Sequence, residues 1–259
     1  MQLSIKANFP EVKRLLEANA KQVRFAAATA LNKVAAKAKP AVQTSMRQVF
    51  DRPTPWVINS LRIKFATKVK LEAEIAFKDK NAVENARSMV EPHIFSGVRR
   101  PKSMELRLRR IGVLPQGWSV VPGAAAKLDS FGNMSKGQIS LLLNVIGAYT
   151  EAGYNKANAK TVARLAKGGS KTSQYGQYGY AWLVNPVSGA RRIKHLKPGI
   201  YQRIKTAFGS SLKPVLIFVS RASYKARLPF QSVVDRVVRA EFQGEFDRAY
   251  AQALATAKP

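Results

Sequence analysis

The stretch SLKPVLIFVSRASYKARLPF, residues 211–230, decides how the second half of this chain folds. Its apolar run VLIFV, residues 215–219, is short and predicts a buried central strand. The basic segment SRASYKAR, residues 220–227, predicts a turn at the end of that strand. Phe230 then opens an apolar stripe at helical spacing that continues to Leu254, which predicts a final helix of about seven turns.

A second amphipathic helix is predicted near the N-terminus, over residues 10–39. Pro10 suits a first helical position, and apolar residues recur at helical spacing beyond it. The alanine-rich segment FAAATALNKVAAKA, residues 25–38, allows one face of this helix to pack closely. Pro40 predicts a break or a kink, and a further helical piece is predicted over residues 41–50.

Two strands are predicted between residues 61 and 77. The preceding segment DRPTPW, residues 51–56, contains two prolines, which predict an extended or turn conformation in place of a helix. Apolar and polar residues then alternate over residues 61–65 and 71–77, the pattern of half-buried strands. The basic residues of the first strand are expected to face Glu72 and Glu74 of the second.

The remaining segments complete a layout of helix, strands, insertion, strands and helix. Residues 81–150 are predicted to be an insertion with one helix, capped by Ser135 with Gln138 as its capping-box partner. Residues 151–177 are predicted to be a flexible loop that is rich in basic residues. Strand patterns return from residue 178 onward. We therefore predict an α+β fold in which residues 1–80 and 178–259 form the core domain. Its mainly antiparallel sheet is packed by the long N- and C-terminal helices.

Charge dominates the composition. The 259 residues include 44 Lys and Arg against 15 Asp and Glu, a net charge of +29. A field of that strength attracts polyanions, of which nucleic acid and an acidic protein surface are the candidates. The sequence contains no cysteine, which excludes disulfides and thiolate metal sites. No apolar run reaches the roughly 18 residues of a membrane span and no signal-peptide core is present, so we expect cytoplasmic synthesis and no membrane partner.

Residues suited to catalysis are scarce. The two histidines, His93 and His195, lack a neighbouring carboxylate in the sequence, so we interpret them as surface or packing residues. The carboxylates Glu72 and Glu74 fit a solvated strand face better than a cation site. The segment GGSKT, residues 168–172, lacks the spacing of a phosphate loop. We predict no enzymatic activity, no catalytic or metal-binding residue and no cofactor.

The basic region in the second half gives the stronger signal. No Asp or Glu occurs between Ala152 and Val234, whereas Lys and Arg recur throughout. Alternating aromatics near Trp182 would suit base stacking, but sheet core is the favoured interpretation of that pattern. Any nucleic-acid contact is expected to be independent of base sequence and sensitive to salt. The residues predicted to contact nucleic acid or a neighbouring subunit are Arg191, Arg192, Lys194, Lys197, Arg221, Lys225 and Arg227.

Three segments in a fixed order carry a resemblance to a known family. They are the alanine-rich helix RFAAATALNKVAAKAK, the segment FDRPTPWVINSLRIKFATKVKLEAEIAFKD, and PGIYQRI with KPVLIFVSRASYKARLPF before the final helix. This order resembles phage tail-completion and neck proteins, the minor tail protein Z group. The insertion over residues 81–150 is longer than the plain family pattern.

The resemblance implies a structural protein of the virion neck, at the head–tail junction. It implies a homo-oligomeric ring, such as a hexamer, around the DNA path, with portal, adaptor or tail-tube proteins as neighbours and non-specific DNA contact. Such proteins have no catalytic residues to carry over. Two alternatives remain open at this level. One is a stand-alone nucleic-acid-binding protein that acts without sequence preference, and the other is a nuclease that would need Glu72 and Glu74 as metal ligands.

Overall fold

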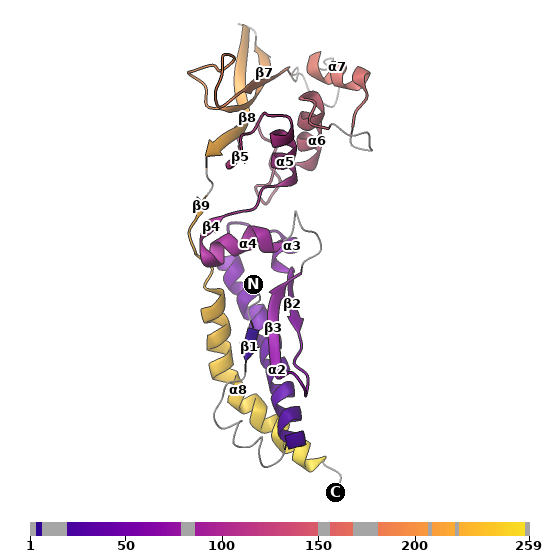
Figure 1. Ribbon diagram of the computed structural model, residues 1–259, viewed down its shortest axis with the longest axis vertical. Helices are drawn as coiled ribbons and strands as arrows, with labels where there is room; N and C mark the ends of the chain where they lie inside the picture. The colour runs from indigo at the N-terminus through magenta and orange to yellow at the C-terminus, as the bar shows by residue number, and fades with distance from the viewer. Residues whose placement is uncertain are drawn as a thin grey trace. The chain divides into compact units, whose positions relative to one another are not determined.

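The computed structural model describes residues 4–6, 20–78, 86–149, 156–167, 181–206, 209–220 and 223–256. The chain divides into two compact units (Figure 1). Unit 1 consists of Met1–Gly97 with Lys225–Pro259, and unit 2 consists of Val98–Tyr224. The chain leaves unit 1 at strand β4 (Gly97–Val98) and returns at strand β9 (Ser223–Tyr224), and these two short strands pair.

Two long helices form the body of unit 1. Helix α2 (Ala20–Val49) and helix α8 (Phe230–Ala255) lie side by side and run in opposite directions (Figure 1). Small side chains on α2 let this helix pack closely in the core of unit 1, because an alanine adds only a methyl group to a contact. The fully buried alanines of α2 are Ala26, Ala27, Ala30, Ala35 and Ala38.

Pro40 does not interrupt α2, so of the break or kink predicted there, the break is wrong. Pro40 is exposed and lies within the continuous helix. A proline ring inside a helix removes one backbone hydrogen bond and crowds the preceding turn. On both sides of Pro40 the helix buries apolar residues, Ala38 and Val42, and this packing holds the backbone in helical form through the proline.

A three-stranded antiparallel sheet in the order β1-β3-β2 packs against α2. Its strands are β1 (Ser4–Lys6), β2 (Leu61–Lys64) and β3 (Glu72–Phe77), which confirms the two strands predicted from alternation. Ile63 faces Ile75 across the β2–β3 pair, and Lys64 faces Glu74 with an ion pair of 3.0 Å. The predicted cross-strand pairing of basic and acidic residues is therefore confirmed for Lys64.

Two shorter helices also lie in the described part of unit 1. Helix α3 (Pro55–Ile58) begins inside the segment that was predicted to be non-helical, and that prediction is wrong for its last two residues. Pro55 occupies the first turn, where a missing N–H costs nothing, and the Thr54 side chain caps the Val57 N–H. Helix α4 (Ala86–Phe95) follows the sheet.

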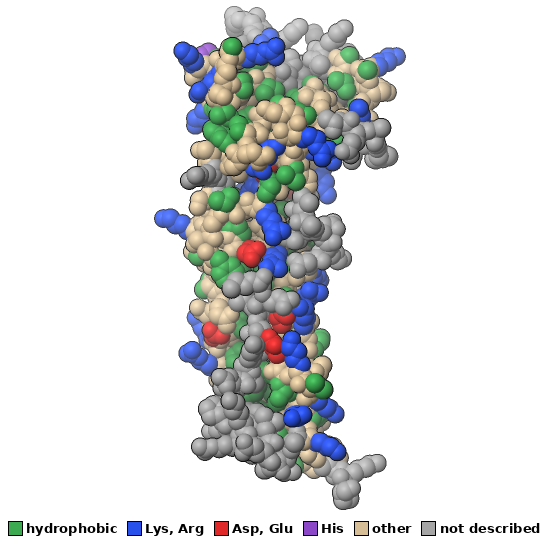
Figure 2. All heavy atoms as spheres, viewed as in Figure 1, with side chains coloured by type: hydrophobic (Ala, Val, Ile, Leu, Met, Phe, Trp, Pro, Cys, Tyr) green, Lys and Arg blue, Asp and Glu red, His purple; other side chains and the backbone are tan. Residues whose placement is uncertain are grey.

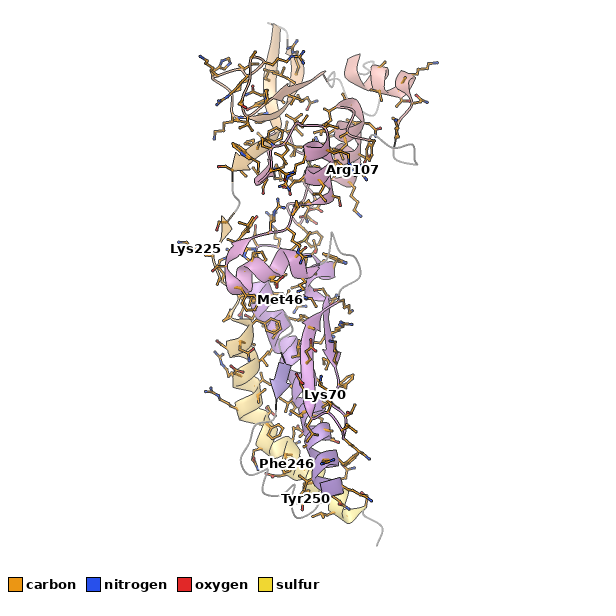
Figure 3. The ribbon with its side chains drawn as sticks, viewed as in Figure 1. Met46, Lys70, Arg107, Lys225, Phe246 and Tyr250 are labelled. Atoms are coloured by element: carbon orange, nitrogen blue, oxygen red, sulfur yellow. The ribbon has the colours of Figure 1, made fainter. Side chains whose placement is uncertain are left out.

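Aromatic side chains on α8 pack against one another in unit 1. The rings of Phe242 and Phe246 lie 6.1 Å apart, and those of Phe246 and Tyr250 lie 5.9 Å apart and nearly parallel. Figure 3 labels Phe246 and Tyr250 near the C-terminal end of α8, and Met46 at the other end of the helix pair. This spacing of three to four residues is the stripe predicted from the sequence, so the helix beginning at Phe230 is confirmed.

Unit 2 is built on a four-stranded antiparallel sheet in the order β5-β8-β7-β6. Its strands are β5 (Trp118–Pro122), β6 (Ala181–Asn185), β7 (Gly199–Thr206) and β8 (Gly209–Ser220). Strand β8 lies between β5 and β7 and buries Val215, Leu216 and Phe218, which confirms VLIFV as a buried central strand.

The described residues of unit 2 form three helices: α5 (Ser103–Arg110), α6 (Lys136–Val145) and α7 (Ala159–Lys167). Leu108 of α5 and Leu142 of α6 share one core with Ile200 and Phe218 of the sheet. Ser135 caps α6 as predicted, by accepting a hydrogen bond from the Gln138 N–H at 3.3 Å.

The Gln138 side chain does not complete the predicted capping box. Its amide contacts the preceding loop instead, donating to the Ala125 carbonyl at 3.2 Å and accepting from the Lys127 N–H at 2.7 Å. The Ser135 N–H, which a capping box would satisfy, donates to the Lys127 carbonyl at 2.9 Å. The Gln138 side chain is therefore available to bond residues 125 and 127, and these bonds hold that segment against α6.

A carboxylate with no exposed surface, Glu105, connects α5 to the sheet of unit 2. Both of its oxygens pair with the Arg99 guanidinium, at 2.6 and 2.8 Å. It also accepts hydrogen bonds from the N–H groups of Lys102, at 2.8 Å, and Val120, at 2.7 Å. Four donors thus surround one buried charge, which is the arrangement that a buried ion needs.

The predicted α+β class is confirmed, with antiparallel sheets and long terminal helices packed on a sheet. The strands, however, form separate sheets in the two units, because β3 pairs with β1 and β2, whereas β8 pairs with β5 and β7, and β7 pairs with β6. The unit bounds therefore differ from the predicted core of residues 1–80 and 178–259.

The middle of the chain also contains more helix than predicted. The 81–150 segment contains α4, α5 and α6, where one helix was expected. Helix α7 lies within the predicted loop 151–177, of which residues 151–155 and 168–177 are outside the described residues. None of the described helices combines the length and the apolar character needed to cross a membrane.

Candidate nucleic-acid interface

Four of the predicted contact residues lie on one loop of unit 2. Strands β6 and β7 pair so that Asn185 faces Gly199, and residues 186–198 form the loop between them. This segment is called the basic loop below. All four of its Lys and Arg side chains are exposed: Arg191, Arg192, Lys194 and Lys197.

One buried side chain organises the backbone of the basic loop. Asn185, at the end of β6, has no exposed surface. Its amide nitrogen lies at hydrogen-bond distance from the carbonyls of Ile193, Leu196 and Lys197, at 3.3, 2.9 and 3.1 Å. Its amide oxygen accepts from the Ile193 N–H at 2.8 Å. A single asparagine therefore fixes the path of the chain on both sides of Lys194.

Further hydrogen bonds hold the two ends of the basic loop. The Tyr201 hydroxyl donates to the Lys197 carbonyl at 2.8 Å, and the Phe218 N–H donates to the Pro198 carbonyl at 2.9 Å. Burial raises the pKa of the Tyr201 phenol, so the hydroxyl stays protonated and able to donate. At the other end, the Arg192 N–H donates to the carbonyl of Gly189, whose φ of 109° suits glycine alone.

The four cations of the basic loop have no acidic partner among the described residues. Unit 2 contains 21 Lys and Arg but only three acidic residues, Glu105, Asp129 and Glu151. Glu105 is buried on Arg99, and Asp129 accepts hydrogen bonds from the N–H groups of Phe131 and Asn133. The positive charge of this unit is therefore left for solvent or for a partner.

Unit 1 has a more balanced surface. It contains 23 Lys and Arg against 12 acidic residues, and many of its acids form ion pairs within the unit. Lys37 contacts both Glu241 and Glu245, at 2.6 and 2.7 Å, and Lys70 contacts Glu72 at 3.4 Å. Figure 2 shows Lys and Arg side chains over both units, with the acidic side chains visible mainly over unit 1.

The other predicted contact residues do not join the basic loop in one unit. Lys225 (labelled in Figure 3) and Arg227 are exposed and belong to unit 1, where the Arg227 N–H donates to the His93 carbonyl at 2.7 Å. Arg221 lies outside the described residues. The seven residues thus do not form one continuous site within either unit.

The two histidines and two glutamates that were considered for catalysis pack against an aromatic ring, form ion pairs or are exposed. His93 packs edge-on against Phe50 at 5.1 Å, and burial, with a smaller contribution from Arg227, lowers its pKa. His195 is exposed on the basic loop. Glu72 and Glu74 pair with lysines. Within the described ranges, no three His, Cys, Asp or Glu residues gather closely enough to bind a metal ion.

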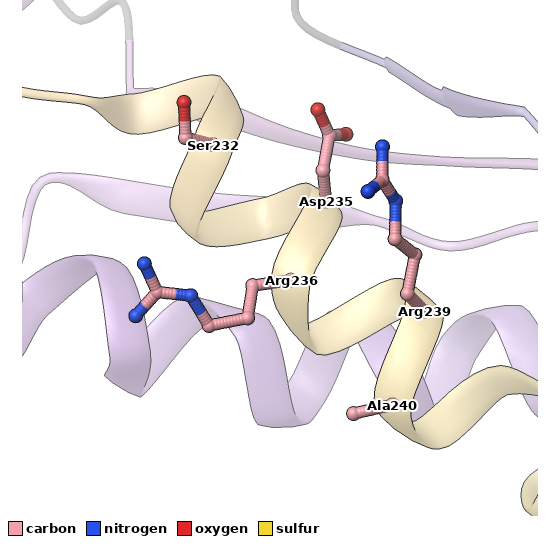
Figure 4. Close-up of a pocket in the computed structure, with 5 residues that line it drawn as sticks. All are labelled: Ser232, Asp235, Arg236, Arg239 and Ala240. Atoms are coloured by element: carbon pink, nitrogen blue, oxygen red, sulfur yellow. The ribbon is translucent and has the colours of Figure 1, made fainter.

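A shallow hollow on α8 is a second feature of the surface (Figure 4). Its described lining residues all come from this helix: Ser232, Asp235, Arg236, Arg239 and Ala240. The Asp235 carboxylate already accepts from the Gln231 amide at 2.7 Å. One helix face offers few converging contacts to a ligand, so the basic loop is the better candidate site.

Sequence analysis predicted the cations of the basic loop as contact residues, but it did not predict a role for Asn185. An asparagine before a proline indicates a turn, and nothing in the local pattern shows that its side chain reaches residues eight to twelve positions further on. Glu105 was missed for the same reason, since its partner Val120 is 15 residues away. Compared with known proteins, the chain matches no family model, no curated protein and no solved structure.

Proposed function

We propose that this protein is a structural component of a tailed-phage virion, a head–tail connector or tail-completion protein that forms an oligomeric ring around the DNA path. The unequal distribution of charge is the observation that carries this proposal. Unit 2 has a large excess of exposed Lys and Arg, and its only described acids are Glu105 and Asp129. A ring around DNA needs basic surface that binds phosphates without reading bases.

A ring also needs subunit contacts, and unit 1 has an exposed apolar surface that suits them. The turn between β2 and β3 presents Phe65 and Val69 with 63% and 94% of their surface exposed, next to Phe25 of α2 at 41%. We call these three residues the apolar turn. Exposed apolar groups of this kind often mark protein–protein interaction sites.

The backbone of the apolar turn is held in place. Asn32 of α2 donates to the Ala66 carbonyl at 3.0 Å and accepts from the Ala66 N–H at 2.6 Å. The Lys68 ammonium lies 5.2 Å from the centre of the Phe25 ring, which places the turn beside α2. A rigid apolar surface loses little conformational entropy when it is buried against a neighbouring subunit.

Electron microscopy tests the proposal directly. Negative-stain images of the purified protein, alone and mixed with portal or tail, are expected to show rings, located at the neck in the mixtures. Deletion of the gene from the phage is expected to leave heads and tails unjoined. Mutant virions that join normally and inject their DNA would contradict the proposed role.

The second candidate function is a stand-alone protein that binds nucleic acid without sequence preference. The pre-formed basic loop favours it, because such a protein needs only one cationic surface and no ring. It predicts tight, salt-sensitive binding by the monomer, lost in the double variant Arg191→Glu with Arg192→Glu. Monomers at all concentrations, together with such binding, would favour this candidate over the connector.

A further inference from the structure

The basic loop differs from an ordinary charged loop because its backbone is fixed from inside the unit. The described polar atoms that hold it from outside the loop come from buried or partly buried groups: the Asn185 amide, the Tyr201 hydroxyl and the Phe218 N–H. The charged side chains take no part in these bonds and are exposed. The loop therefore separates a rigid support from a set of cations available to a ligand.

The chemistry of the loop surface favours phosphate over protein. Protein–protein interfaces are enriched in aromatic residues and depleted in lysine at their centres. Within the described part of residues 181–224, no large apolar side chain is exposed. Four cations occur instead within seven residues, 191–197. A ligand that offers negative charge at regular intervals and demands no apolar contact fits this surface, and a nucleic-acid backbone is such a ligand.

We propose that the basic loop is a pre-organised site for the phosphate backbone of DNA, and that Asn185 is its positioning residue. This inference rests on the DNA contact in the proposed function and assigns that contact to one loop. Arg191 and Arg192 neutralise phosphates, and Asn185 acts through the loop backbone without touching the ligand. Because no base edge is read, affinity is the same for unrelated duplex sequences of equal length.

The charge of the loop is tested with the full chain and a fluorescein-labelled 30-base-pair duplex of mixed sequence. Binding is followed by fluorescence anisotropy from 50 to 400 mM NaCl. The double variant Arg191→Gln with Arg192→Gln is expected to bind at least about tenfold more weakly at 100 mM NaCl. It is also expected to lower the slope of log K against log salt by about 2, since each lost phosphate contact removes about 1.

A matched control variant is Arg236→Gln with Arg239→Gln, on exposed positions of α8 (Figure 4). It removes the same charge from unit 1 and is expected to change the affinity less than about threefold. If both double variants weaken binding equally, the contact is spread over the whole cationic surface and the inference about the loop fails. The connector proposal survives that result, because the rings are scored separately by microscopy.

The role of Asn185 is tested by a double-mutant cycle. Asn185→Ala keeps every charge of the loop and is expected to weaken binding about fivefold to tenfold, because the cations lose their fixed spacing. In the Asn185→Ala background, removal of Arg191 and Arg192 is expected to cost clearly less than in the wild type. Purely additive effects would overturn the positioning role.

Controls keep these outcomes distinct. The circular dichroism of each variant is compared with that of the wild type at the binding temperature, so that unfolding is not scored as lost affinity. Should Asn185→Ala not fold, Tyr201→Phe removes the single bond to the Lys197 carbonyl and takes its place in the cycle. A wild-type chain that binds an acidic polypeptide such as polyglutamate but not the duplex would overturn the choice of DNA as ligand.

Discussion

At the scale of single residues, Glu105 shows how a buried charge is stabilised in a strongly basic unit. Burial alone would raise the pKa of this carboxyl group. The hydrogen bonds from Arg99, Val120 and Lys102 outweigh that effect, so the pKa of Glu105 lies below its ordinary value. A carboxyl group whose pKa is lowered in the folded state stabilises the fold above its unfolded pKa.

We therefore expect the stability of unit 2 to fall as the pH drops through the folded pKa of Glu105. Glu105→Gln removes the charge and leaves Arg99 without its carboxylate partner, which is expected to cost about 3–5 kcal/mol at neutral pH. Urea unfolding at pH 3 to 7, followed by tryptophan fluorescence, measures both effects. The variant is also expected to lose most of the acid dependence, and an unchanged pH profile would contradict this role.

At the scale of elements, the two long helices of unit 1 depend on small side chains. Ala35 and Ala36 are neighbours on α2, but Ala35 is fully buried and Ala36 is exposed. The core of unit 1 thus distinguishes two chemically identical residues by the face of α2 on which they lie.

The substitution Ala35→Leu is expected to destabilise unit 1 by about 1–3 kcal/mol, because the added atoms do not fit the close packing of the core around Ala35. Ala36→Leu adds the same volume on the solvent side and is expected to change the stability by less than about 0.5 kcal/mol. Urea titration at 25 °C compares the free energies of unfolding of the two variants. Equal effects of the two variants would mean that the core of unit 1 is not closely packed at Ala35.

Glycine has a specific role in the sheet of unit 2. A side-chain carbon at Gly199 of β7 would collide with the Leu216 carbonyl of β8, whereas one at Gly137 of α6 would meet nothing. We expect Gly199→Ala to destabilise the unit by more than about 1 kcal/mol and Gly137→Ala to stabilise it by up to about 1 kcal/mol. Thermal unfolding of the two variants tests this contrast, and a neutral Gly199→Ala would contradict the close strand contact.

At the scale of the whole molecule, the charge of +29 opposes association of the chain with itself unless an interface or a polyanion offsets it. The apolar turn of unit 1 is the described surface best suited to provide that interface. Assembly is therefore expected to strengthen when salt or DNA screens the charge.

The double variant Phe65→Ser with Val69→Ser is expected to reduce the oligomeric fraction in mass photometry while leaving the unfolding temperature unchanged. Both side chains are exposed, so their loss removes no core packing. Leu254→Ser, a single exposed apolar residue near the end of α8, is the control and is expected to assemble normally. Oligomers that persist in the double variant would rule out this surface as the subunit contact.

The sequence by itself determined the elements whose pattern is local. The alternation at residues 61–77, the apolar run VLIFV and the stripe from Phe230 each predicted the element that the structure contains. Side-chain periodicity is set by the geometry of a strand or a helix, so a short window of sequence is sufficient. The lack of acidic residues from Ala152 to Val234 likewise located the basic loop without knowledge of its shape.

Only the tertiary structure decided how these elements are grouped and how the loop is supported. Division of the strands into separate sheets depends on pairing between segments such as β5 and β8, about a hundred residues apart, and no local pattern specifies that choice. The same holds for Asn185 and Glu105, whose polar side chains became structural because distant backbone groups surround them in the fold. An ordinary turn asparagine supports a candidate binding site only because it bonds backbone groups eight to twelve residues further along the chain.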